Sequence, residues 1–299
     1  MNILVIGGTR FFGRRLVHKL LQHGHAVTIA SRGNTADDFG DAVKRVRVDR
    51  ADDAAMLAAF AEQSYDVVFD QVGFTPQHAK GAVAAFAGRV KRYIFTSTMA
   101  VYEGKEALTT EADFDPFTHT VDLDAKAYDY GEGKRQAEAY LFQHAPFPVV
   151  AARVAMVVSG DDDYTGRFAF HVQHVAEGTS IGVLAEEHPI SYVTAWDVAD
   201  LLYFLGVESD FVGPINAAND GFYSTQSLCR QIGSLVGKTP LFHVAENPDE
   251  DALFSPYAFP VTLKVKNDLA RRIGFSFPDW TDRLPQMVAE VMGAPKRDH

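Results

Sequence analysis

Cysteine and basic residues are both scarce in this 299-residue chain. The single cysteine, Cys229, excludes an internal disulfide framework and a cysteine-based zinc cluster. Lys and Arg number 28 against 39 Asp and Glu, so the net charge is −11. A protein whose main partner is a phosphate backbone normally carries a basic footprint, so nucleic acid is disfavoured as that partner.

Long apolar runs are also missing. The most apolar stretch, Val149 to Val158, is interrupted by Arg153 and is much shorter than the ~18 residues of a membrane span. The first apolar run follows directly after Met1-Asn2, without the basic segment of a signal peptide. We therefore expect a cytoplasmic protein that does not enter a membrane.

Proline is rare in the first half, where only Pro76 and Pro116 of the 13 prolines precede Pro146. Short apolar runs alternate there with helical stretches. We interpret the runs as buried strands at residues 2–7, 26–30, 46–48, 66–69, 92–96 and 149–153. Helices are predicted over a stretch with Leu16, Val17, Leu20 and Leu21 on one face, ending near Gly24, and over residues 52–60 and 77–86. This alternation predicts a parallel sheet covered on both faces.

The second half has more loops, and three helices are predicted in it. A capping box at Thr194-Ala-Trp-Asp197 opens the first helix. Ser224 caps the second, which places Leu228, Ile232 and Leu235 on one face and ends at Gly237. The third covers residues 266–273.

A glycine-rich turn, Gly7-Gly8-Thr9-Arg10-Phe11-Phe12-Gly13, joins the first predicted strand to the first helix. Glycines let a backbone approach a pyrophosphate, and the start of a helix supplies free N–H groups and a positive dipole end. An ordinary strand–helix turn is the alternative. The position at the start of the strand–helix pattern favours a dinucleotide site.

The spacing from Gly7 to Gly13 resembles the GxxGxxG turn of extended short-chain dehydrogenase/reductases, with Arg10 in place of the middle glycine. The form GGTRFFG is similar to an atypical branch that includes the chloroplast stem-loop-binding proteins. Resemblance to this NAD-dependent epimerase/dehydratase family covers nearly the whole chain. It implies an α/β fold, with a Rossmann-type doubly wound parallel sheet and a smaller C-terminal substrate domain. The two domains would be interleaved, with residues 1–159 and about 182–220 binding NAD(P) and about 160–181 and 221–299 binding substrate.

The end of the second predicted strand bears on the choice of cofactor. An acidic residue there would bind the ribose 2′-OH of NAD, whereas arginine accommodates the 2′-phosphate of NADP. The strand ends Ala30-Ser31-Arg32, so Ser31, Arg32 and Arg10 are candidate phosphate ligands and NADP is favoured over NAD. Two solvated arginines beside a turn are the alternative. The resemblance also assigns to the cofactor the turn residues Gly7, Thr9, Arg10, Phe11, Phe12 and Gly13, then Asp49 beside the adenine, and Gln71, Val72 and Gly73 along it.

Tyr130 and Lys134 are four residues apart and share a face if their segment is helical. A phenol with its ordinary pKa near ~10 is a poor proton shuttle at pH 7, and a nearby cation favours the phenolate. Gly131 and Gly133 each cost about 1 kcal/mol in a helix, which indicates close packing of cofactor or backbone. Exposed residues of a tyrosine-rich helix are the alternative, since Tyr128 lies nearby.

The strand end Ser97-Thr98 resembles the family's Ser/Thr segment. The resemblance implies that Tyr130 is the acid/base and that Lys134 anchors the ribose, besides modulating the phenol. Thr98, with Ser97 as second choice, would orient the substrate oxygen. Arg167 lies where the family often has a basic residue, so it is a candidate contact for an anionic substrate. His171 and His174 lack a ligand pattern, and we expect no metal site.

These observations predict an NAD(P)(H)-dependent oxidoreductase or epimerase that acts on a secondary alcohol or ketone, sugars and sugar nucleotides included. The family's 4,6-dehydratases carry Asp-Glu where Met99-Ala100 stand here, which disfavours a dehydratase. The resemblance also implies a homodimer. Two alternatives stay open: a cofactor-sensing regulator without turnover, and an RNA-binding or RNA-processing protein of the stem-loop-binding type. The second would need Arg14, Arg15, Lys44 and Arg45 to form a basic patch.

Overall fold

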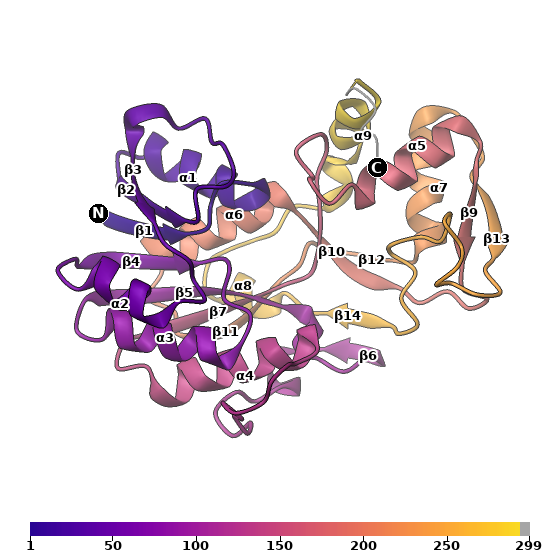
Figure 1. The fold of residues 1–299 in the computed structure, drawn as a ribbon. Helices are drawn as coiled ribbons and strands as arrows, with labels where there is room; N and C mark the ends of the chain where they lie inside the picture. Colours follow the sequence, from indigo (N-terminus) through magenta and orange to yellow (C-terminus); the bar gives the residue numbers. More distant parts are fainter. Residues whose placement is uncertain (294–299) are drawn as a thin grey trace.

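A seven-stranded parallel sheet is the centre of the fold, and its strands run in the order β11-β7-β5-β4-β1-β2-β3. The computed structural model describes residues 1–293, so residues 294–299 of the predicted substrate domain lie outside the described part (Figure 1). The strands are β1 Asn2–Ile6, β2 Ala26–Ser31, β3 Val43–Arg47, β4 Tyr65–Asp70, β5 Val90–Thr98, β7 Val149–Val154 and β11 Gly213–Ala217. In register, Ile3 is opposite Val27 of β2 and Val67 of β4. Chain order reverses at β1, the point where ligands bind in such sheets.

Helices cover both faces of this sheet, as the alternating pattern predicts. Their bounds are α1 Phe11–Gln22, α2 Asp53–Phe60, α3 Pro76–Phe86, α4 Tyr130–His144 and α6 Ala195–Tyr203. Helices α1 and α6 pack together on one face, and α2, α3 and α4 lie on the other (Figure 1). Leu16, Val17 and Leu20 of α1 are fully buried, and Gly24 has a φ of +74° just beyond its end. The predicted doubly wound α/β fold is confirmed.

Strand β3 differs from its prediction, because it begins at Val43 rather than at residue 46. It lies at the edge of the sheet, and Lys44 and Arg45 are exposed there. Charged side chains at an edge strand interrupt the apolar run on which the prediction depended. The other five predicted strands agree with the structure to within a few residues.

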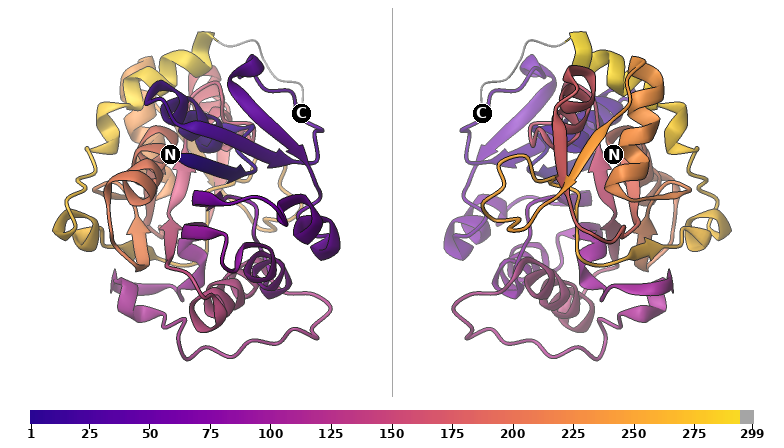
Figure 2. Two further views of the ribbon diagram at one scale, coloured as in Figure 1. Left: turned by 90° about the vertical axis from the view of Figure 1, so that its left-hand side faces the viewer. Right: turned by 90° about the vertical axis from the view of Figure 1, so that its right-hand side faces the viewer.

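The rest of the chain builds a second unit beside the carboxyl ends of the strands (Figure 1). Its strands are β6 Lys105–Thr109, β8 Met156–Val158, β9 Ser180–Val183, β10 Ile190–Thr194, β12 Phe222–Tyr223, β13 Leu241–Val244 and β14 Leu263–Val265. Its helices are α5 Arg167–Glu177, α7 Thr225–Val236 and α9 Leu284–Gly293, whereas α8 Asp268–Arg272 packs against β11 of the central sheet. In Figure 2 the irregular segment 114–129 loops out beside α4. The predicted division of the chain into two interleaved domains stays an interpretation.

Capping in the second half follows the sequence with small differences. Ser224 caps α7, and Gly237 ends it with a φ of +69°, as predicted, although Leu235 is exposed. The Thr194 hydroxyl caps α6 by accepting from the Asp197 amide, but the Thr194 amide binds Asn219, so the predicted capping box is only half formed. Among the helices of residues 1–293, none is both long and apolar enough to cross a membrane.

Candidate active site

A cleft of about 390 Å³ opens at the carboxyl ends of β1 to β4. It brings together six of the residues that were assigned to the cofactor, namely Gly7, Thr9, Ser31, Arg32, Asp49 and Val72. These residues come from four separate turns of the chain. The sheet order therefore brings these predicted cofactor residues together in one cleft.

The start of α1 fits an anionic group. Gly7 has a φ of +97°, which favours glycine, and no side chain caps the helix at Arg10. A Cβ on Gly13 would lie 2.1 Å from Oε1 of Gln71, so this glycine is required for the glutamine to lie against the helix. The Gln71 amide nitrogen is buried and has no hydrogen-bond partner among residues 1–293. Donors without acceptors at this point match the diphosphate of a dinucleotide.

The adenosine end of the cleft is basic. The Ser31 hydroxyl accepts a hydrogen bond from the Gly33 amide at 3.2 Å, and Arg32 is exposed beside it. Arg47, at the end of β3, also lies here, because a Cβ on Gly33 would be 3.6 Å from its Nε. Neither arginine forms an ion pair with a carboxylate in the described part of the chain. Sequence reasoning missed Arg47, and the charged alternation of β3 is the signal that could have found it.

Arg10 is not at that end of the cleft. Its guanidinium lies 5.3 Å from the ring centre of Tyr164, which also packs against Phe11. Phe11 has a φ of +53°, a left-handed conformation that is costly outside glycine. The structure therefore separates Arg10 from Ser31 and Arg32, the other two candidate phosphate ligands.

The helix that carries Tyr130 and Lys134 is α4, and Tyr130 is its first residue. Asp129 caps it by accepting from the Glu132 amide at 2.8 Å. A Cβ on Gly131 would lie 2.6 Å from the Ala100 carbonyl oxygen, and one on Gly133 would lie 2.7 Å from that of Phe74. The sequence indicated that either a cofactor or a backbone segment packs closely against these glycines, and the structure shows a backbone segment at each of them.

Tyr130 lies next to Phe74, which lines the cleft, with the two ring centres 6.4 Å apart. The ring is 56% exposed, yet loss of water around the hydroxyl raises the pKa of the phenol. The Thr98 hydroxyl and the charge of Arg167 both lower that pKa and favour the phenolate, whereas Lys134, the predicted modulator of the phenol, is not among the groups that shift it. Arg167 begins α5 and contacts the Met156 sulfur at 3.4 Å. Sequence reasoning gave Arg167 only a substrate contact and missed its effect on Tyr130.

Lys134 points inward from the same helix and is 2% exposed. Its Nζ donates hydrogen bonds of 2.7 Å to the carbonyls of Gly73 and Thr96. The rings of Phe74 and Phe95 flank it at 4.7 and 4.8 Å. Burial lowers the pKa of the ammonium to about 8, with Asp70 and Glu138 acting in the opposite direction.

The two strand-end hydroxyls lie in different surroundings. Ser97 is buried and donates to Glu138, which in turn pairs with Arg153 at 2.8 Å. Thr98 accepts from the Ala100 amide at 3.2 Å, and its hydroxyl is near enough to Tyr130 to lower the pKa of the phenol. Thr98 is therefore the hydroxyl that the structure brings to Tyr130, and Ser97 lies behind it.

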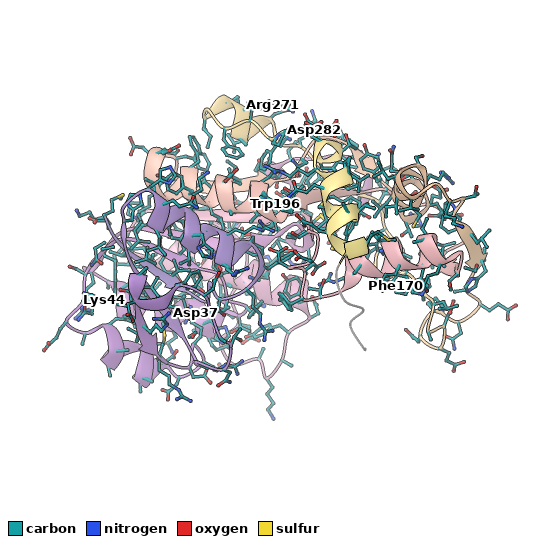
Figure 3. All side chains as sticks on the ribbon, turned by 90° about the horizontal axis from the view of Figure 1, so that it is seen from above. Asp37, Lys44, Phe170, Trp196, Arg271 and Asp282 are labelled. Carbon is teal, nitrogen blue, oxygen red and sulfur yellow. The ribbon has the colours of Figure 1, made fainter. Side chains whose placement is uncertain are left out.

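The basic patch needed for an RNA-binding surface is largely neutralised. Arg14 pairs with Asp38, Arg15 with Asp162 at 2.7 Å, and Arg45 with Asp37 at 2.6 Å. Figure 3 shows Asp37 and Lys44 in the same part of the molecule.

Buried His171, considered above as a metal ligand, instead bonds the Arg167 carbonyl and the Ser255 hydroxyl, both at 2.7 Å. Within residues 1–293, no group of three His, Cys, Asp or Glu side chains is arranged to hold a metal ion.

Comparisons with known proteins bear on the fold and the family of the chain. The chain is 28% identical over 114 residues to the chloroplast stem-loop binding protein of 41 kDa b from Arabidopsis thaliana, and the match spans 34% of this chain and 30% of that protein. Among solved structures, the UDP-glucose 4-epimerase of Thermotoga maritima with UDP-glucose has a TM-score of 0.76 at 18% identity, covering 98% of this chain and 99% of the other. That of Thermus thermophilus with NAD has a TM-score of 0.74 at 19% identity, covering 99% and 100%.

A putative epimerase from Burkholderia cenocepacia has a TM-score of 0.78 at 20% identity, with 98% of each chain covered. At such identities these structures show the fold alone. The family model of the NAD dependent epimerase/dehydratase family matches residues 3–216, which is more than half of the chain. The protein therefore belongs to the NAD-dependent epimerase/dehydratase family.

Proposed function

We propose that the protein is an NAD(P)(H)-dependent oxidoreductase or epimerase that acts on a secondary alcohol or ketone, including that of a sugar or sugar nucleotide. One observation carries the proposal. The Tyr130 phenol lies beside the Thr98 hydroxyl and within reach of the charge of Arg167. This group of side chains can hold a substrate oxygen and move its proton.

The cofactor would be held by residues of the cleft. The uncapped start of α1 and Gly7 suit its diphosphate, and Asp49 and Val72 line the adenosine side. Lys134 would anchor the ribose next to the nicotinamide. A nicotinamide cofactor supplies the acceptor or donor of a hydride, which is the redox chemistry that none of these side chains provides.

The side chains then divide the proton chemistry among them. Tyr130 would take the proton when an alcohol is oxidised and return it when a ketone is reduced. Thr98 would hold the reacting oxygen, and Arg167 would bind an anionic part of the substrate. Elimination, as in a dehydratase, is disfavoured because Met99 and Ala100 supply no acid or base, and Ala100 packs against Gly131.

NADP is the cofactor that the adenosine end favours. A 2′-phosphate carries negative charge, and Ser31, Arg32 and Arg47 offer a hydroxyl and two arginines that form no ion pair with a carboxylate of residues 1–293. Each hydrogen bond to a charged group contributes about 1.5–3 kcal/mol, or roughly 10- to 100-fold in affinity.

Nicotinamide fluorescence tests the catalytic proposal. Tyr130→Phe should abolish turnover of secondary alcohols and sugar nucleotides, yet leave the Kd for cofactor within about twofold, because the change removes only a hydroxyl at the substrate side. Tyr128→Phe is the matched control, since this phenol is bonded to Asp122 and Gln77 away from the site. Full activity in Tyr130→Phe would refute the role of Tyr130.

Cofactor choice is tested by the same titration with NADPH and NADH. Arg32→Asp and Arg47→Asp should each lower the NADPH preference at least ~10-fold, because each replaces a phosphate ligand by a like charge. Lys44→Asp, on the same strand as Arg47, is the control for a general change of charge. Equal affinities of the wild-type protein for NADPH and NADH would overturn the preference. No binding of either would overturn the proposed function.

A further inference from the structure

A buried carboxylate that the motifs do not include lies beneath the catalytic lysine. Asp70 ends β4 and is fully buried. Its Oδ2 accepts from the Tyr93 hydroxyl at 2.6 Å and from Arg50 Nη2 at 2.8 Å. The same Arg50 nitrogen donates to the His78 carbonyl at 2.7 Å. Three elements and a loop thus meet at one carboxylate.

This carboxylate also holds the loop on which Lys134 depends. Asp70 Oδ1 accepts from the Val72 amide at 3.1 Å. A Cβ on Gly73 would lie 2.9 Å from Asp70 Oδ2, so the loop passes directly over the carboxylate. The Gly73 carbonyl is in turn one of the two acceptors of the Lys134 ammonium, at 2.7 Å. A continuous path therefore runs from Arg50 through Asp70 and Gly73 to Lys134.

We propose that Asp70, held by Arg50 and Tyr93, is a positioning residue for Lys134, because it fixes the Gly73 carbonyl and keeps the lysine ammonium charged. The role rests on the proposed function, in which Lys134 binds the cofactor. Arg50 and Val72 both line the cofactor cleft, so the carboxylate joins the adenosine side of that cleft to the lysine.

The charges around Lys134 support this assignment. Burial lowers the pKa of Lys134, Asp70 and Glu138 raise it, and Arg50 lowers it. His78, from α3, does not add a charge of its own, because burial and the nearby Arg50 lower its pKa and its Nδ1 accepts from the Phe74 amide at 3.2 Å. The remaining neighbours are the rings of Phe74 and Phe95 and two carbonyls. Asp70 has the largest opposing effect to burial.

The experiment is an NMR titration of the cofactor-free protein with isotope-labelled lysine, in which the Lys134 signal is assigned by its loss in Lys134→Met. Asp70→Asn should lower the pKa of Lys134 by about one unit, a tenfold change in proton affinity. Tyr93→Phe is the matched variant, because it removes one hydrogen bond to the same oxygen and leaves the charge. It should leave the pKa of Lys134 unchanged although it also destabilises the fold.

Asp70→Asn leaves the Arg50 guanidinium buried without its ion-pair partner, and this variant can fail to fold for that reason. A second variant covers that case. Arg50→Met/Asp70→Asn removes both charges, and it should lower the pKa of Lys134 by less, because Asp70 acts on the lysine more strongly than Arg50 does. A wild-type pKa of Lys134 in whichever of these variants folds would overturn the proposal. Failure of the wild-type protein to bind NADPH or NADH would instead refute the proposed function, since the titration needs no cofactor.

Discussion

Arg153 is the centre of a buried network behind the active site, and Arg153→Met tests how much that network stabilises the protein. Arg153 and its partner Glu138 are both fully buried. The guanidinium also donates to the Tyr102 hydroxyl at 2.9 Å and to the carbonyls of Glu111 and Phe114 at 2.9 and 3.1 Å. The arginine therefore ties β7 and α4 to Tyr102, which follows β5, and to the segment that follows β6.

The magnitude follows from what the substitution leaves behind. Methionine fills much of the volume but leaves the Glu138 carboxylate buried without its cation, which costs about 3–5 kcal/mol. Two carbonyls also lose their donor, and each such loss adds about 1 kcal/mol or more where water cannot enter. We expect a loss of about 5 kcal/mol in the free energy of unfolding, a large part of the ~5–15 kcal/mol of a typical domain.

Urea unfolding followed by far-UV circular dichroism measures this loss. Arg230→Met is the control, because Arg230 forms a 2.9 Å ion pair with Glu187 but is 59% exposed, and exposed pairs contribute about 0–1 kcal/mol. The double variant Arg153→Met/Glu138→Leu should recover most of the lost stability, since no charge then remains buried alone. If Arg153→Met were no less stable than Arg230→Met, the reasoning about the buried network would be refuted.

Two further predictions concern stability. His171 is fully buried, and burial lowers its pKa from 6.5 to about 4. The imidazole is therefore protonated at a lower pH in the folded state than in the unfolded state. Stability should therefore fall as the pH falls from about 6.5 to 4, by roughly 3 kcal/mol, and urea unfolding of His171→Gln should lack this part of the pH dependence. Gly131→Ala brings a Cβ to within 2.6 Å of the Ala100 carbonyl, so it should cost about 1–3 kcal/mol. Gly293→Ala, whose Cβ meets no atom of residues 1–293 within 4 Å, should change the unfolding midpoint little.

Much of the fold could be predicted because its signals are local. Most central strands contain a short apolar run, and most helices begin or end at a residue with a capping role. Strands β3 and β11, at the two edges of the sheet, are the exceptions: β3 exposes charged side chains that remove the apolar signal, and β11 contains Pro214 and Asn216. The half-formed capping box at Thr194 is another, because Asn219, which is 25 residues away, takes the amide that the local rule assigns to Asp197.

The residues of the candidate site also fall into two groups, those that local sequence predicts and those that only the packing of the chain reveals. Tyr130 and Lys134 come from one helix, so their spacing alone predicts a shared face. Asp70, Arg50 and the effect of Arg167 on Tyr130 could not be found from spacing, because these contacts depend on how separate strands and loops pack in three dimensions. Asp70 resembles any acidic residue at the end of a strand until the structure shows Arg50, Tyr93 and the Val72 amide around it.

The net charge of −11 therefore says less about ligand binding than the pairing of individual charges does. Arg14, Arg15 and Arg45 each face an aspartate on the outer surface, which reduces the attraction of that surface for a polyanion. Arg32 and Arg47, in contrast, lie beside the cofactor cleft without an ion pair among residues 1–293. A cleft with low-dielectric walls focuses the field of such charges. An acidic protein of this kind can thus attract a small phosphorylated ligand into the cleft while the rest of its surface repels a long one.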